Sequence, residues 1–134
     1  MQYWLVKSEP ETYSWDKFVE KGKDSWDGVR NFQARNNLRS MQENDLVLFY
    51  HSGKDKAVIG IAKVAGDPYP EPGNEDQWMA VDLKVEKKLN KPVTLAEVKK
   101  NPNLQNLALI KNSRLSVMPL KLEEFQSIMD MAEL

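Results

Sequence analysis

The sequence predicts an α+β fold, a small mixed β-barrel of about five to six strands with peripheral helices. Three observations support this prediction: several segments have the length and pattern of β-strands, capped helical segments lie between them, and no internal repeat occurs. At 134 residues the chain has the length of one domain, and we assign residues 1–134 to it.

Five segments have strand patterns. Residues 45–51 hold a continuous apolar run that is typical of a strand covered on both faces, and residues 57–64 are apolar and branched. Gly60 interrupts the second segment, where a bulge or a barrel bend is expected, and we predict that the two pair as an antiparallel hairpin. Apolar and polar residues alternate from 79 to 86, as in a half-buried strand. The opening strand is predicted at residues 2–7 and the last at 114–117, with Pro119 at its end.

Capping signals locate the helices. Ser14 and Gly22 bracket a short helix over residues 15–21, followed by a loop at 23–25. A second helix is expected after Asn31, ending near Met41. Thr94 begins a capping-box sequence, and the helix that it opens should stop before Pro102. Residues 122–131 have helical apolar spacing and should cover one opening of the barrel. The proline-rich stretch 66–74 is expected to be an ordered surface loop, and residues 104–110 carry no clear pattern.

Composition excludes several classes of function. The chain has no cysteine and a single histidine, His51, which excludes disulfides, thiolate zinc sites and multi-histidine metal centres. We therefore expect no metal and no cofactor. No apolar run is long enough to span a bilayer and no signal peptide is recognisable, so we expect a cytoplasmic protein without membrane contact. The net charge of −1 argues against coating nucleic acid by bulk electrostatics, so any such binding must be local and shape-driven.

The segment from Trp26 to Arg39 carries an unusual residue mixture. Three of the four arginines lie within it, at positions 30, 35 and 39, together with aromatic and amide side chains. Guanidinium groups grip phosphate with two bonds, while aromatic and amide groups suit the reading of an unstacked base. The alternative interpretation is an amphipathic helix with Phe32 and Leu38 in the core and its arginines paired with acids.

Other candidate positions lie elsewhere in the chain. Pro10 should hold the corner after the first strand rigid, so that Lys7 and Ser8 point to fixed places. If the last strand lies beside the first, Arg114 and Ser116 converge on the same site. Common enzyme signatures are absent, and a triad built on His51 with Ser8 or Ser52 is disfavoured because no local motif supports it. His51 is either a polar strand-end residue or a hydrogen-bonding group at a pocket mouth beside Tyr50.

Four motifs in order, Tyr3–Pro10, Trp26–Asn36, Tyr50–Ser52 and Arg114–Val117, resemble the EVE domain family over essentially the whole chain. The resemblance implies a PUA-like fold related to YTH and ASCH domains and a function in reading modified bases, in eukaryotes modified cytosine in DNA. In YTH readers a Lys-Ser corner and a Gly-Val segment line the pocket, and here these match Lys7 and Ser8, and Gly28 and Val29. The YTH cage tryptophan falls at Arg30, so Trp26 is the first candidate for the aromatic wall, followed by Trp15 and Tyr50. The lysine-rich extension of nuclear members is missing, which favours a bacterial protein.

We therefore expect a non-catalytic module that binds DNA or RNA carrying a methylated or hydroxymethylated base, which is flipped into an aromatic pocket. The predicted base-pocket residues are Lys7, Ser8, Trp15, Trp26, Val29, Asn31, Tyr50, His51 and Ser116, with Ser8 and Asn31 making edge contacts. The predicted phosphate-binding residues are Arg30, Arg35, Arg39 and Arg114. A monomer is slightly favoured, although the sequence leaves the oligomeric state open. One rival is an enzyme acting on a modified nucleotide or nucleic acid, with Glu9, Asp27 or His51 as general acid or base. Another is an adaptor that binds a peptide or a small ligand.

Overall fold

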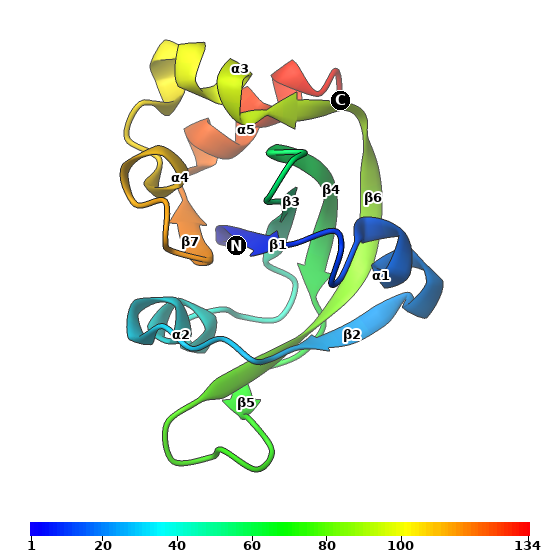
Figure 1. Cartoon of the computed structure of the whole chain (residues 1–134), viewed down its shortest axis with the longest axis vertical. Helices are drawn as coiled ribbons and strands as arrows, with labels where there is room; N and C mark the ends of the chain where they lie inside the picture. Colours follow the sequence, from blue (N-terminus) through cyan, green and yellow to red (C-terminus); the bar gives the residue numbers. More distant parts are fainter.

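The structure, a computed structural model, describes all residues 1–134, and its centre is one mixed sheet of seven strands. Six strands lie in the order β2-β6-β4-β3-β1-β7, and the short strand β5 pairs with β6 (Figure 1). Only the β1–β3 pair is parallel. The strands are β1 (Tyr3–Ser8), β2 (Lys23–Trp26), β3 (Leu46–His51), β4 (Ala57–Val64), β5 (Tyr69–Pro70), β6 (Met79–Thr94) and β7 (Val117–Leu120).

The sheet curls without closing, because its two edge strands, β2 and β7, do not pair with each other. Helix α2 (Phe32–Arg39) lies at this opening (Figure 1), where Asn37 Nδ2 donates a hydrogen bond to the Val117 carbonyl oxygen at 2.7 Å. The α+β fold with a curled mixed sheet and peripheral helices is confirmed. The barrel stays open, however, and a helix rather than a strand bridges its edges.

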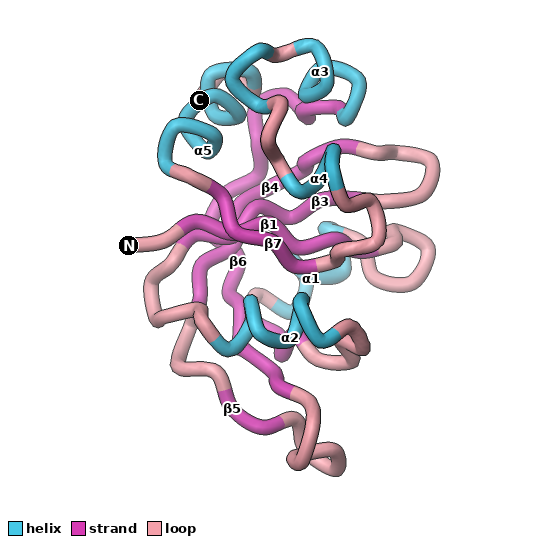
Figure 2. Tube along the Cα trace, turned by 90° about the vertical axis from the view of Figure 1, so that its left-hand side faces the viewer, coloured by secondary structure: helices cyan, strands magenta, loops and turns pink.

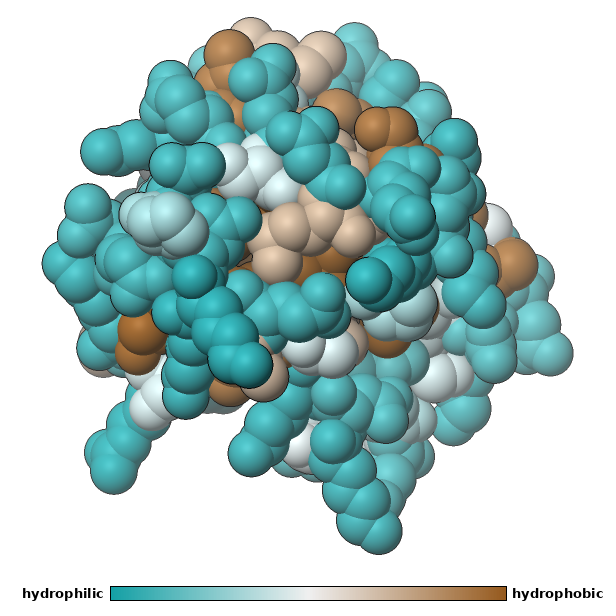
Figure 3. Space-filling view, turned by 90° about the horizontal axis from the view of Figure 1, so that it is seen from above, coloured by the Kyte–Doolittle hydropathy of each residue, from teal (hydrophilic) through white to brown (hydrophobic).

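The predicted helix caps are confirmed. Helix α1 (Trp15–Lys21) is capped by Ser14 and ends at Gly22, which has a positive φ of 73°. Helix α3 (Leu95–Lys100) begins with the capping box, and helix α5 (Leu122–Met131) has the predicted bounds. Figure 2 shows α3 and α5 together at one end of the sheet, and the surface on that side is mostly hydrophilic with small apolar areas (Figure 3). None of the helices combines the length and the apolar character needed to cross a membrane.

Four local predictions need correction. Residues 23–25, expected to be a loop, belong to strand β2, which pairs antiparallel with β6. Strand β6 continues to Thr94, beyond the predicted end at residue 86, and pairs with both β2 and β4. The last strand is Val117–Leu120 and includes Pro119, which is tolerated because β7 is an edge strand. The stretch 66–74, expected to be a surface loop, contains the two-residue strand β5, which pairs with β6. Residues 104–110, which carry no clear sequence pattern, contribute to a 3₁₀ turn (Pro102–Leu104) and to helix α4 (Ala108–Lys111).

An aromatic cluster fills the core beneath the first helix. The Phe49 ring stacks on Phe18 at 5.4 Å and meets the edges of Trp15 and Trp26 at 5.3 and 5.6 Å. The Trp15 ring lies directly over Gly60, where any side chain would collide with it. The strand register shifts on either side of Gly60, so the predicted bulge is confirmed. Trp26 connects this cluster to the polar cavity described next, which it lines.

Candidate functional site

A cavity of about 540 Å³ opens between the end of β1, strand β2 and the segment that leads into α2. Sites that bury small ligands commonly measure about 300–1,000 Å³, so this cavity has room for a nucleobase with its sugar. Its lining is mostly polar and comes from three separate parts of the chain. The lining residues are Lys7, Ser8, Glu9, Thr12, Tyr13, Asp24, Ser25, Trp26, Asp27, Gly28, Val29, Arg30 and Ser116.

The corner after β1 forms one wall. The backbone N–H groups of Thr12 and Tyr13 both donate to the Glu9 carbonyl oxygen, at 3.0 and 2.8 Å. Ser8 Oγ donates to the Tyr13 carbonyl oxygen at 2.5 Å, which ties the start of the corner to its end. Because the Ser8 hydroxyl hydrogen is used in this way, its oxygen can still accept a bond from a ligand.

Trp26 and Tyr13 supply the aromatic surface of the cavity. Trp26 is half-buried, with its ring edge-on to Phe49 below and to Tyr13 at 6.2 Å. Tyr13 Oη donates to Asp24 Oδ2 at 2.6 Å. Burial, reinforced by this bond to Asp24, raises the pKa of Tyr13 far above its ordinary value. Tyr13 is therefore a neutral phenol whose hydrogen is already used, and it offers a ligand its ring and its oxygen lone pair.

Charged groups surround the aromatic wall. Lys7 Nζ donates to the Ser113 carbonyl oxygen at 2.8 Å, and burial lowers the pKa of Lys7. An ammonium group has three donors, so Lys7 can also donate to a ligand. The side chains of Glu9, Asp24 and Asp27 also line the cavity. When ionised, a carboxylate can accept hydrogen bonds but cannot donate them. No group of three or more His, Cys, Asp or Glu side chains is arranged to hold a metal ion.

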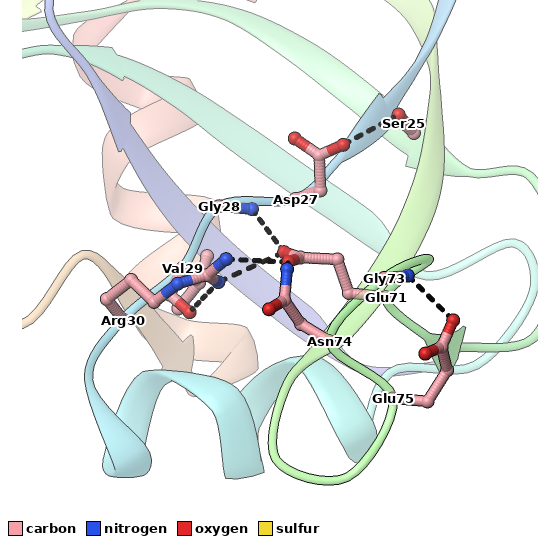
Figure 4. A network of polar contacts seen from close by, with 9 residues as sticks. All are labelled: Ser25, Asp27, Gly28, Val29, Arg30, Glu71, Gly73, Asn74 and Glu75. Atoms are coloured by element: carbon pink, nitrogen blue, oxygen red, sulfur yellow. Dashed lines mark hydrogen bonds and ion pairs between the residues drawn. The ribbon is translucent and has the colours of Figure 1, made fainter.

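A carboxylate from a distant loop fixes the segment that closes the cavity. Glu71, buried at 5% exposure, accepts the Gly28 backbone N–H at 2.6 Å and two guanidinium N–H bonds from Arg30, at 2.6 and 3.1 Å (Figure 4). Asn74 Nδ2 donates to its second oxygen at 2.9 Å. The Arg30 bonds, followed by the Gly28 bond, lower the pKa of Glu71 to about 2. Gly28 has a positive φ of 74°, so the chain turns sharply where Glu71 holds it.

Next to Arg30, two aromatic rings stack on each other. The rings of Phe32 and Trp78 are 5.1 Å apart at an interplanar angle of 10°. Arg30 Cζ lies 5.0 Å from the Trp78 ring centroid, and Arg35 Cζ lies 4.8 Å from that of Phe32. We call these four residues the stacked ladder. Phe32 is 57% exposed, so the alternative interpretation that places it in the core is wrong, whereas Leu38 is buried as that interpretation required.

Comparison with known proteins decides the family. The family model of the EVE domain matches residues 2–131. The chain belongs to the EVE domain family. Thymocyte nuclear protein 1 of the mouse is 32% identical, over 98% of this chain and 74% of that protein. An Agrobacterium tumefaciens crystal structure is 40% identical with a TM-score of 0.96, covering 100% of this chain and 94% of that one.

One solved relative is a complex with DNA. The crystal structure of the human THYN1 protein in complex with 5-methylcytosine containing DNA is 31% identical to this EVE domain. It has a TM-score of 0.92 and covers 100% of this chain and 99% of that one. A Zymomonas mobilis ASCH protein, 16% identical with a TM-score of 0.66, shares the fold alone. These neighbours are consistent with the PUA-like fold that the resemblance implied.

The structure of this EVE domain brings six of the predicted site residues to the cavity: Lys7, Ser8, Trp26, Val29, Arg30 and Ser116. Strand β7 pairs with β1 as the sequence analysis supposed, and the Lys7 backbone N–H donates to the Ser116 carbonyl oxygen at 2.9 Å. Ser116 therefore reaches the cavity from the far end of the chain. Arg114, by contrast, lies exposed and does not line the cavity.

Four predicted pocket residues lie elsewhere, and their assignment is corrected. Trp15 is buried over Gly60, and Tyr50 is buried within β3. His51 Nε2 accepts the Trp15 backbone N–H at 3.0 Å, and its Nδ1 contacts Asp55 at 3.0 Å, so both ring nitrogens are engaged. Asn31 caps α2 by accepting the Ala34 N–H at 2.9 Å. Each of these side chains packs in the core or forms bonds within the fold, and none of them lines the cavity.

The arginines differ in how they are held. Only Arg30 forms an ion pair, with Glu71. Arg35 donates to the Gln77 carbonyl oxygen at 2.9 Å and to Asn36, and Arg39 is exposed in the last turn of α2. Because Arg35, Arg39 and Arg114 form no ion pair with an acid, their positive charges are not neutralised within the protein.

The sequence analysis missed Glu71 and Trp78. Glu71 stands between Pro70 and Pro72, which restrict the backbone around it, and a carboxylate held so rigidly was a signal of a structural or binding role. Trp78 lies in a stretch of the sequence that carries no motif, so nothing local distinguished it. Its role depends on the loop that carries it lying against α2, where its ring stacks on Phe32.

Proposed function

We propose that this EVE domain is a non-catalytic nucleic-acid-binding module whose cavity receives a modified base, such as a methylated cytosine, turned out of the base stack. The observation that carries the proposal is a cavity of about 540 Å³ with Trp26 in its wall and converging polar groups around it. The DNA complex of the human relative, at 31% identity, supports the same class of ligand.

The cavity offers the interactions that base extrusion requires. Removing a base from the stack costs a few kcal/mol, and stacking on an aromatic ring returns roughly 1–3 kcal/mol. Trp26 supplies the ring. The carboxylates of Asp24 and Asp27 can accept from an exocyclic amino group, as aspartate does with the cytosine N4 amino group. This lining favours a base with an amino group over thymine or uracil.

The phosphates of such a ligand remain outside the cavity. Three carboxylates and one ammonium group, that of Lys7, line it, so acids outnumber bases there even though Asp24 pairs with Lys21. Arg35, Arg39 and Arg114, in contrast, carry charges that are not paired with acids. Because Arg30 is held by Glu71, we propose that it shapes the rim of the cavity and that the other three arginines bind phosphate. Such contacts position the strand without reading sequence.

His51 is not positioned to act as the general base of an enzyme. Both His51 ring nitrogens are engaged by the fold, and His51 does not line the cavity. Glu9 and Asp27 do line the cavity and remain candidates for a general acid or base, so catalysis needs its own experiment. Incubation of the protein with modified oligonucleotides, followed by mass spectrometry of the nucleosides, should return the starting composition. Conversion of the modified nucleoside would contradict the non-catalytic part of the proposal.

Binding is tested by fluorescence polarisation with labelled DNA and RNA oligonucleotides that are identical except for one central cytosine, 5-methylcytosine or 5-hydroxymethylcytosine. We expect preferential binding to a modified strand, and loss of this preference in Trp26→Ala. Val19→Ala removes an exposed apolar side chain from α1 outside the cavity lining and serves as the control that keeps the preference. Equal, weak binding of wild type to every oligonucleotide would refute the proposal.

A further inference from the structure

Apart from the cavity, the stacked ladder is the most distinctive surface feature of the protein. Phe32 is the most exposed large hydrophobic side chain apart from the terminal Met1, and it begins helix α2. A single exposed apolar side chain is ordinary on a protein surface. Here the exposed ring is stacked on a second ring, however, and each of the two rings has a guanidinium group over it.

The stacked ladder is adjacent to the cavity mouth. Arg30 lines the cavity and lies 5.0 Å from the Trp78 ring, and Trp78 lies 5.1 Å from the Phe32 ring. Successive base pairs are about 3.4 Å apart along a duplex, so two contacts of this length span at most about three base steps. A strand with one base in the cavity therefore passes its neighbouring bases within reach of Phe32.

Polar bonds hold the stacked ladder rigid at both ends. Arg30 is fixed by two bonds to Glu71, and Arg35 donates to the Gln77 carbonyl oxygen at 2.9 Å. Helix α2 and the loop that carries Trp78 are thereby joined in one unit. A stacking surface that is already ordered loses little conformational entropy when a base lands on it.

We infer that the stacked ladder is a second nucleic-acid contact, on which a base beside the extruded one stacks at the end formed by Phe32 and Arg35. This inference rests on the proposed function. Trp78 stacks on the Phe32 ring and the Arg35 guanidinium also lies over that ring, so the base meets the guanidinium plane that Phe32 supports. Bases stack on guanidinium planes as they do on aromatic rings. Glu75 and Asp76 are exposed in the same loop and disfavour phosphate there, so the backbone runs on the side of Arg35 and Arg39.

The two contacts have separable effects on binding. Phe32 does not line the cavity, so its removal should weaken modified and unmodified oligonucleotides equally. Stacking of one base corresponds to a loss of roughly 5- to 150-fold in affinity. Trp26→Ala, in contrast, should reduce the preference for the modified base.

The test uses a duplex with one central 5-methylcytosine and 2-aminopurine placed one, two or three positions to either side, together with its unmodified counterpart. On binding of wild type, we expect 2-aminopurine fluorescence to change at one side only. Phe32→Ala should abolish this change and weaken both duplexes within the range above, and Phe32→Trp should restore it. Leu122→Ala, which truncates an exposed side chain on α5, should behave as wild type.

The outcomes separate this inference from the proposed function. Failure of wild type to distinguish the two duplexes would overturn the proposed function and this inference with it. Modification-selective binding whose affinity and 2-aminopurine signal are unchanged in Phe32→Ala would overturn the second contact alone. If Phe32→Ala changed the sedimentation coefficient of the free protein and left oligonucleotide affinity unaltered, the stacked ladder would be a contact between copies of this chain, which would also overturn the inference.

Discussion

Replacing Glu71 with glutamine tests whether one carboxylate holds the cavity rim together. In the folded protein Glu71 accepts bonds from Gly28, Arg30 and Asn74, and its pKa falls from the ordinary 4.5 to about 2. The difference corresponds to roughly 3 kcal/mol of folding free energy at neutral pH. Glu71→Gln keeps the shape but places an amide near the guanidinium. Because the Arg30 side chain is 45% exposed, water can solvate it, and we expect a loss of about 2–3 kcal/mol.

The pH dependence of this loss has a defined sign. A carboxyl group with a lowered folded pKa contributes its full stability above its unfolded pKa and loses that contribution as pH falls through the folded pKa. The stability of wild type relative to Glu71→Gln should therefore be constant from pH 7 to about 5.5 and decrease between about pH 5 and pH 2. Taking the difference cancels the other acids, such as Asp24 and Glu97, whose pKa values are also lowered.

Urea denaturation followed by tryptophan fluorescence at pH 7, 5, 4 and 3 measures this difference. Glu75→Gln is the matched control, because Glu75 lies in the same loop but is exposed and bonds only to the nearby Gly73 N–H. We expect the control to lie within about 0.5 kcal/mol of wild type. A Glu71→Gln loss that stayed constant from pH 7 to 3, or that matched the control, would refute the assignment of the rim's stability to this ionised group.

Three further predictions concern the core and the charged surface. Gly60→Ala should destabilise the protein by roughly 1–3 kcal/mol and change the near-ultraviolet circular dichroism, because the new methyl group meets the Trp15 ring; unchanged spectra and stability would contradict this packing. Asp45→Ala should cost roughly 3–5 kcal/mol in a denaturant titration, because the buried carboxylate accepts three bonds, all at 3.0 Å; a loss under 1 kcal/mol would show that water replaces them. Arg35→Gln and Arg39→Gln should each reduce the slope of log affinity against log salt by about 1 in oligonucleotide titrations; an unchanged slope would remove that residue from phosphate binding.

Local physics made much of the fold predictable from the sequence. The bounds of α1 followed from Ser14 and Gly22, because a serine side chain satisfies a free N–H at a helix start and glycine adopts the positive φ that ends a helix. The hairpin of β3 and β4, including its irregularity at Gly60, followed from the apolar run and one glycine. These features depend on residues within a few positions of each other.

What the sequence could not provide is long-range pairing. Strand β2 was missed because Lys23–Trp26 has no strand pattern of its own and is fixed by pairing with β6, some sixty residues later. The same reason explains Glu71, whose partners Gly28 and Arg30 lie more than forty residues away. His51 was assigned to the pocket from its neighbour Tyr50, but the docking of α1 gives its ring a structural role.

The charge of the cavity indicates that phosphate attraction and base selection occur at different places on the protein. A basic cavity would attract phosphates and hold any nucleic acid, whereas this one is lined by three carboxylates against one lysine, Lys7, and closed by an arginine that Glu71 already neutralises. Phosphate attraction is left to arginines outside, in a protein whose net charge is only −1. Affinity from the outer arginines is indifferent to the base, so discrimination must come from what the cavity accepts. The acidic lining thus favours a reader that selects a base by its shape and its hydrogen-bond donors.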